Sequence, residues 1–259
     1  MPAGLAGALW RLAGLAEPLA LSRGAWIAAL VVGTLPLLLG AAFGSPQHQV
    51  IAGLALFPLF LGTLRAERFG RGVALVGLAF ASHNAVAIAL SVSSPEAAAL
   101  FPDGADYWSK QQAWITTGQD PEYIVVNWLP AHAQLFVGVA LYSYLSLGFL
   151  GFVQGFYEVD LMNFYVGQLI AHSDSFAPAL LLGWHPWSAL RGLCYVVLLW
   201  ELASWSLERM TGRTLSTPER RLFRWLGAVG LFVADCVVKV VLLDVVRDSL
   251  FHNLAATGG

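Results

Sequence analysis

The sequence predicts an all-α fold, a polytopic transmembrane helix bundle of about seven spans (six or seven) with an amphipathic extracytoplasmic segment. The first observation is composition: 58% of the 259 residues are hydrophobic and 12% are charged, about half the charge of a typical soluble domain. The second is the pattern, because apolar runs recur between short charged segments. In residues 73–92, fifteen of 20 residues are apolar or alanine, and about 20 such residues cross the hydrocarbon core of a bilayer.

The N-terminal third is expected to hold a surface helix and three spans. Residues 1–24 are apolar but interrupted by charges and Pro18, which is typical of a helix lying along the membrane surface. The first three spans, within 25–92, are predicted at 25–44, 50–64 and 72–92. The run 25–44 follows a basic residue and ends in small ones, so it also fits a cleavable signal peptide.

Residues 93–126 interrupt the apolar pattern with six charged residues and three prolines. Within them Trp108, Gln111, Trp114 and Ile115 recur at helical spacing. We therefore expect a short amphipathic helix that rests on the bilayer.

The remaining spans are predicted within a bundle at 127–247, followed by a tail at 248–259. They are expected at 130–153, 160–171, 188–207 and 225–246, of which 160–171 is short for a crossing. Residues 183–187 (Gly-Trp-His-Pro-Trp) indicate an interfacial turn or the mouth of a re-entrant segment. Whether 160–187 spans or re-enters stays open.

Arginines predict the orientation. They crowd two loops, one with Arg65, Arg68 and Arg71 and the other with Arg209, Arg213, Arg220, Arg221 and Arg224. Arginine-rich loops face the cytoplasm. In an inner (cell) membrane, seven crossings place both loops and the N-terminus in the cytoplasm and the C-terminus outside. If 25–44 is removed as a signal peptide, both arginine-rich loops are still expected in the cytoplasm.

Polar side chains inside spans are costly and are the first functional candidates. The candidates are His83, Asn84, Glu158, Asp160, Asn163, Glu201, Asp235 and Lys239. Asp235 and Lys239 lie four residues apart on one helix face, which favours a self-neutralising pair over a proton or ion relay.

Four of the other candidates occur as neighbours along the chain. Glu158 and Asp160 flank the start of the predicted fifth span, as boundary carboxylates or as part of a polar cavity. Glu201 is expected to pair with Lys239 or an arginine. His83 and Asn84 are expected to hydrogen-bond between helices rather than to carry protons.

Five histidines lie near the predicted outer boundary: His48, His132, His172, His185 and His252. Of these, His132, His172 and His185 form a candidate metal site together with Asp174. Imidazole and carboxylate suit zinc or iron, but no pair has a recognised ligand spacing, and histidines satisfied by water are commoner. No Walker loop, GxSxG, HExxH or CxxC is present, so we assign no catalytic residue and expect no cofactor.

Part of the chain, from Asn127 to Leu250, resembles the stage II sporulation protein M family of integral membrane proteins. The resemblance rests on Asn127-Trp128-Leu129, on the Gly-rich stretch ending Leu147-Gly148-Phe149, on 162–167 (Met-Asn-Phe-Tyr-Val-Gly) and on the last span with Asp235 and Lys239. His185-Pro186-Trp187 falls where the family often has a His-Gly turn, but Arg191 intervenes and Glu201 comes late. The resemblance implies a membrane partner or scaffold for envelope machinery.

Taken together, the sequence favours an integral membrane subunit or scaffold of an envelope complex without intrinsic catalysis. No nucleophile–base set is present, whereas the amphipathic Trp-rich segment and the two arginine-rich loops are surfaces suited to docking. Its expected partners are the lipid bilayer and other membrane proteins, and not nucleic acid, because the net charge of −2 provides no basic field. One alternative is a small-solute or ion transporter that uses the intramembrane charges. Another is an intramembrane metal-dependent enzyme at His132, His172 and His185.

Overall fold

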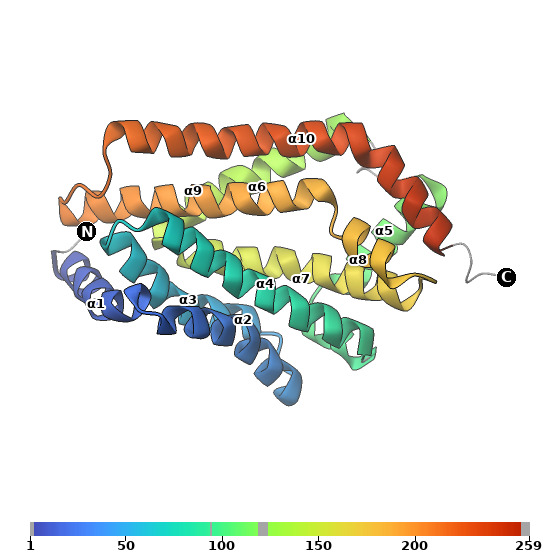
Figure 1. Ribbon diagram of the computed structural model, residues 1–259, viewed down its shortest axis with the longest axis horizontal. Helices are drawn as coiled ribbons and strands as arrows, with labels where there is room; N and C mark the ends of the chain where they lie inside the picture. Colours follow the sequence, from blue (N-terminus) through green and yellow to red (C-terminus); the bar gives the residue numbers. More distant parts are fainter. Residues whose placement is uncertain (1–2, 94, 119–123, 255–259) are drawn as a thin grey trace.

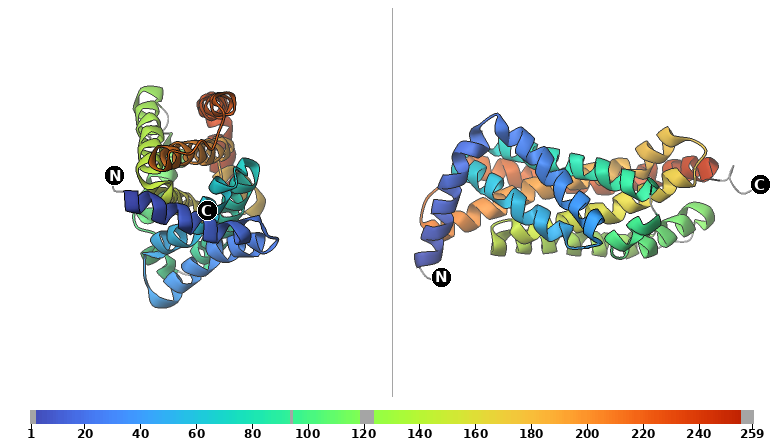
Figure 2. Two further views of the ribbon diagram at one scale, coloured as in Figure 1. Left: turned by 90° about the vertical axis from the view of Figure 1, so that its left-hand side faces the viewer. Right: turned by 90° about the horizontal axis from the view of Figure 1, so that it is seen from below.

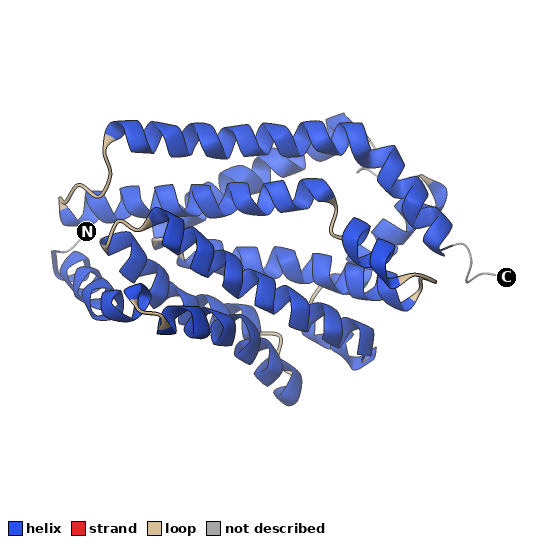
Figure 3. Cartoon of the chain, in the orientation of Figure 1, coloured by secondary structure: helices blue, strands red, loops and turns tan. Residues whose placement is uncertain are grey.

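The computed structural model describes residues 3–93, 95–118 and 124–254, and within these ranges every regular element is a helix (Figure 3). The predicted all-α class is therefore confirmed. The α-helices are α1 (Ala3–Leu21), α2 (Gly24–Phe43), α3 (His48–Arg65), α4 (Phe69–Ser93), α5 (Gly104–Thr117), α6 (Val125–Ser146), α7 (Phe149–Ala171), α8 (Phe176–Gly183), α9 (Pro186–Thr211) and α10 (Pro218–Leu254), with a 3₁₀ helix, η1, at Pro95–Leu100.

Six of the described helices are long and apolar enough to cross a membrane, namely α2, α3, α4, α6, α9 and α10. The shortest of them, α3, has 18 residues and is about 27 Å long at 1.5 Å per residue. Large apolar side chains remain exposed on the outer faces of α2, α6 and α10: Ile27, Val31, Leu35, Val137, Leu141, Leu145, Val229, Val233, Val237 and Val241. Such a belt is stable against lipid tails, and the protein is a membrane-embedded bundle.

Helix α7 corrects the predicted fourth and fifth spans. The expected run 130–153 is broken at Leu147 and Gly148, whose φ angles are 56° and 96°, so that a separate 23-residue helix begins at Phe149. A Cβ on Gly148 would come within 2.9 Å of Phe60, so both the backbone angle and the space favour glycine. At about 34 Å, α7 is as long as the spanning helices, and it packs against α3, α4, α5, α6 and α8.

The two arginine-rich loops lie at the same end of the bundle, which we call the basic end. There the indole of Trp10 lies between two guanidinium groups, 4.6 Å from Arg65 and 4.5 Å from Arg213. Helix α1 lies across the bundle axis at this end (Figure 2). At the other end Asn253 of α10 hydrogen-bonds to Ser175 of the α7–α8 connection. Helix α1 and the last turns of α10 therefore lie at opposite ends of the bundle (Figure 1).

The amphipathic helix predicted around Trp108 is present as α5, but its apolar face does not rest on lipid. Trp114 and Ile115 are buried in a cluster with Tyr165 of α7 and Leu243 of α10. The apolar face of α5 is therefore covered by the protein itself. The expectation of a bilayer contact is wrong because α7 and α10 extend far enough to bury these side chains.

Candidate functional site

Three helices bring two histidines and an aspartate together inside the bundle, and we call His48, His83 and Asp160 the His–Asp centre. Nε2 of His48 lies 2.8 Å from Oδ2 of Asp160, and Nε2 of His83 lies 2.6 Å from Oδ1. Gln49 donates its amide to Oδ2 at 2.7 Å. Both histidines are 0% exposed and Asp160 is 1% exposed, so the carboxylate is satisfied by the protein and not by bulk water.

Small residues on α2 allow the histidines to reach this position. At Gly33 a Cβ would come within 2.1 Å of the backbone oxygen of Ala79 on α4, and at Gly40 it would come within 3.1 Å of Cβ of His48. The close approach at Gly33 places its carbonyl oxygen 3.2 Å from Nδ1 of His83. Glycines on α2 therefore fix both how near α4 lies and which way the His83 ring faces.

The hydrogen bonds determine where the protons of His83 must be. A carbonyl oxygen only accepts, so Nδ1 of His83 donates to Gly33. Nε2 then carries either a lone pair or a second proton, and it faces a carboxylate oxygen at 2.6 Å. Two lone pairs cannot face each other at this distance, so a proton lies between Nε2 of His83 and Oδ1 of Asp160 in this arrangement.

The surroundings of the centre are aromatic and amide groups. Phe101 packs edge-on against His48, with ring centroids 6.0 Å apart, and Phe156 packs against His83 at 4.9 Å. One helical turn beyond Asp160, Asn163 donates to Asn84 of α4 at 2.9 Å. The expected interhelical hydrogen bonding of His83 and Asn84 is thus confirmed. The apolar rings of Phe101 and Phe156 keep water away from the centre, which strengthens the electrostatic interactions of Asp160.

Asp235 has a different principal partner from the one the sequence favoured. The guanidinium of Arg191 on α9 holds the Asp235 carboxylate with two hydrogen bonds of 3.0 and 3.1 Å. Nζ of Lys239 lies 4.5 Å from the ring centroid of Trp128. The expectation of a self-neutralising Asp235–Lys239 pair fails because Arg191, 44 residues away in sequence, reaches across from the neighbouring helix.

The two remaining carboxylate candidates are also paired. Glu201 on α9 accepts from Arg224 at 2.6 Å and forms an ion pair with Arg221 at 2.7 Å. Of the two kinds of partner expected for Glu201, lysine or arginine, the structure shows arginine. Glu158 accepts from Gln154 at 2.7 Å, one turn earlier on α7. Glu158 and Asp160 lie in the middle of α7 and not at the start of a span, so the prediction of boundary carboxylates is wrong.

The four residues of the predicted outer metal site do not come together. Within the described chain, the set of three ligand-type residues close enough to hold one metal ion is His48, His83 and Asp160. His132 packs on Trp128, and His172 stacks on Trp108 and contacts the Gln168 carbonyl. His185 stacks on Trp187, and Asp174 contacts Asn253 through its backbone N–H, so the prediction of an outer metal site at these four residues is wrong.

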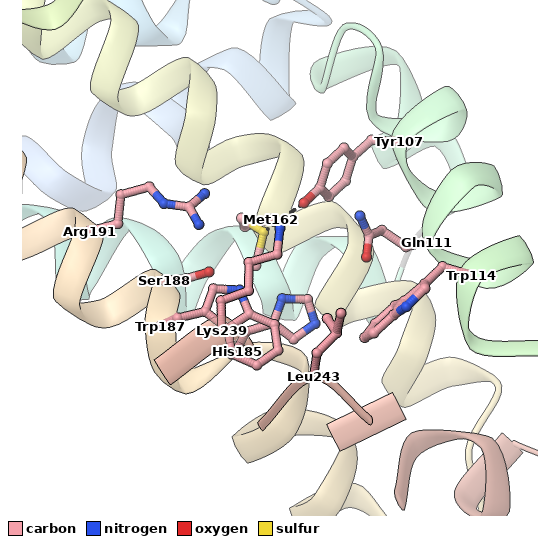
Figure 4. A pocket seen from close by; sticks show the side chains of 10 residues that line it. All are labelled: Tyr107, Gln111, Trp114, Met162, His185, Trp187, Ser188, Arg191, Lys239 and Leu243. Atoms are coloured by element: carbon pink, nitrogen blue, oxygen red, sulfur yellow. Dashed lines mark hydrogen bonds between the residues drawn. The ribbon is translucent and has the colours of Figure 1, made fainter. Parts of the chain in front are cut away.

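A small cavity lies near the end of the bundle opposite the basic end, among α5, α7, α9 and α10 (Figure 4). Its volume is about 30 Å³, enough for about two water molecules. It is lined by Tyr107, Gln111, Trp114, Met162, His185, Trp187, Ser188, Arg191, Lys239 and Leu243. Burial, together with the charges of Lys239 and Arg191, lowers the pKa of His185 to about 3, so this imidazole is neutral at physiological pH.

Two members of the layer around Asp160 were not candidates in the sequence. His48 falls near the predicted outer boundary with Gln49 beside it, and both are polar residues in the first turn of an apolar helix. Their signal was weak because polar residues at a span end usually face water. Only the fold of the α2–α3 hairpin turns them inward.

Comparison with protein-family models, curated proteins and solved structures gives no match for this chain. The resemblance to the stage II sporulation protein M family therefore stays a prediction.

Proposed function

We propose that this protein is a multi-pass transporter of a small inorganic cation in the cell membrane, with Asp160 in its cation-binding layer. One observation carries the proposal: a carboxylate in the middle of α7 is 1% exposed and is held by groups from α3 and α4. Ionisable residues within a membrane are costly and mark ion and substrate pathways.

The placement of α7 supports the same conclusion. It carries Gln154, Glu158, Asp160 and Asn163, yet it is enclosed by other helices of the bundle. A helix in this position whose role was only to pack would need only apolar side chains. Polar groups on an enclosed helix serve an ion that must leave water to cross the bilayer.

The surfaces that favoured a scaffold are largely engaged within the chain. The apolar face of α5 is covered by α7 and α10, and Arg221 and Arg224 pair with Glu201. A scaffold needs such surfaces to be open to a partner. The scaffold stays an untested prediction, and the transporter alternative has the better support.

We further propose that the basic end faces the cytoplasm. Both arginine-rich loops lie there, in keeping with the positive-inside rule. The N-terminus is then cytoplasmic and the C-terminus extracytoplasmic. The α2–α3 connection at residues 44–47, next to His48, then lies on the outer side of α2 and α3.

Transport can be tested with the purified protein in proteoliposomes adsorbed on a solid-supported membrane. Concentration jumps of Na⁺, K⁺, Mg²⁺ and Zn²⁺ chloride are applied in turn. We expect a transient current with at least one cation, lost in Asp160→Asn and retained in the matched control Asp248→Asn, whose carboxylate is exposed and paired with Arg247. Folded wild-type protein that gives no current with any of the four cations would refute the proposal.

A further inference from the structure

We infer that the His–Asp centre binds a divalent first-row transition-metal ion and that this class is the cation transported. The identity of the cargo rests on the proposed function, whereas the binding itself is tested separately below. Each of His48, His83 and Asp160 offers one ligand atom, and these atoms all lie within 4.8 Å of one another.

The ligand types discriminate between classes of cation. Mg²⁺ and Ca²⁺ prefer oxygen ligands throughout. Imidazole nitrogens suit zinc, iron, copper and nickel, and a mixed set of two imidazoles and a carboxylate suits zinc or iron in particular. The centre supplies two imidazoles for one carboxylate, which favours a transition metal over a hard cation.

His83 is oriented as a metal ligand. Histidines that bind metals usually donate their second ring N–H to a carbonyl or carboxylate, which fixes the tautomer and directs the other nitrogen at the ion. The Gly33 carbonyl takes the Nδ1 proton of His83 in this way. Its Nε2 therefore points at the position that a cation shared with Asp160 would occupy.

An orphaned atom independently indicates that the layer is built for a further ligand. Oδ1 of Asn163 is buried and has no hydrogen-bond partner among the described residues. Asn163 follows Asp160 by three residues, so both lie on the same face of α7. Buried polar atoms are nearly always satisfied, and water on a bound ion would supply the partner that Oδ1 of Asn163 lacks.

Metal binding requires only a small expansion. Ligand bonds of about 2.0–2.1 Å in a tetrahedral site separate the ligand atoms by about 3.3 Å. The closest nitrogen–oxygen distances here are 2.6 and 2.8 Å. The metal would replace the shared proton, and the nitrogen–oxygen distances would grow by about 0.5–0.7 Å. His48 has no described partner for its Nδ1, so it is the less firmly oriented of the two imidazoles.

Binding is measured on full-length protein in mild detergent, purified without a polyhistidine tag. Co²⁺ is the spectroscopic probe and Zn²⁺ the competitor. We expect one Co²⁺ per chain, with d–d absorption bands that Zn²⁺ removes and Mg²⁺ does not. Asp160→Asn and His83→Gln should weaken binding by at least about 100-fold, and His48→Gln by about 10-fold.

His252→Gln is the matched control, because this imidazole is exposed and contacts only local groups. Its binding should equal that of the wild type. Absence of Co²⁺ and Zn²⁺ binding in folded wild-type protein overturns the inference, as does binding that survives Asp160→Asn. If currents carried by Na⁺ or K⁺ depend on Asp160 while no metal binds, the inference fails and the transport proposal stands. If metal binds at the centre and no cation crosses, the site stands and transport fails.

Discussion

Replacing Asp160 by asparagine or by alanine separates the charge of this residue from its hydrogen bonds. The asparagine amide matches every contact of the carboxylate without a charge. Its oxygen accepts from His48 and Gln49, and its NH₂ group donates to Nε2 of His83. Nε2 of His83 can accept because the ring carries its proton on Nδ1, which donates to the Gly33 carbonyl. Asp160→Asn should therefore fold as the wild type does, with a stability change below about 1 kcal/mol.

Alanine at the same position removes all three contacts. Each buried partner left without one costs about 1–3 kcal/mol, so Asp160→Ala should lose about 3 kcal/mol or more. For a chain of this size that loss corresponds to a melting temperature lower by roughly 6–12 °C.

Intrinsic tryptophan fluorescence during a thermal ramp in detergent measures both variants, since the chain has 10 tryptophans. Asp248→Asn and Asp248→Ala are the matched controls and should both melt as the wild type does. Equal melting temperatures for Asp160→Ala and the wild type would refute the hydrogen-bond network. An Asp160→Asn variant as unstable as Asp160→Ala would refute the claim that the fold can dispense with the charge.

Two further substitutions test the helix contacts around the centre. Gly33→Ala places a Cβ within 2.1 Å of the Ala79 backbone oxygen, so α2 and α4 must separate, at a cost of about 2–3 kcal/mol. The control Gly77→Ala, whose Cβ meets nothing within 4 Å, should be neutral or up to about 1 kcal/mol more stable. Equal melting temperatures of the two variants would contradict the close packing of α2 on α4. Asp235→Leu removes both hydrogen bonds from Arg191 and should cost about 3 kcal/mol. The Arg191→Met/Asp235→Leu double variant should lose less than the two single variants combined, and strict additivity in SDS-unfolding titrations would count against a coupled pair.

The sequence predicted the bundle well because lipid imposes long apolar runs that can be read without any tertiary information. It failed at Leu147 and Gly148 for the same reason. No charge interrupts the run there, so a break in the backbone was indistinguishable from a continuous span. The polar residues of α7 then suggested a membrane boundary, whereas they belong to a helix shielded from lipid by its neighbours.

The candidate site was only partly predictable. His83 and Asp160 were singled out because polar groups inside spans are costly, but 77 residues separate them in sequence. Nothing local indicates that α4 and α7 face each other at these positions. His48 and Gln49 were harder still, since the polar start of an apolar helix usually meets water, and the turn at Gly44, with a φ of 62°, directs them inward.

The pairing of Asp235 shows the same limit. The spacing of Asp235 and Lys239 correctly placed both side chains on one face of α10, and both are buried. Spacing within one helix cannot reveal a competitor on another. Arg191 forms the bidentate pair because α9 and α10 are adjacent and antiparallel.

X-ray absorption at the zinc edge, on protein loaded with one equivalent of Zn²⁺, tests most directly whether the bilayer-embedded bundle contains a metal centre. The proposed ligands predict first-shell scattering from nitrogen and oxygen alone, with the multiple-scattering signature of two imidazoles, and loss of one imidazole in His83→Gln. Sulfur scatterers, a shell without imidazole, or a spectrum unchanged by His83→Gln would contradict it.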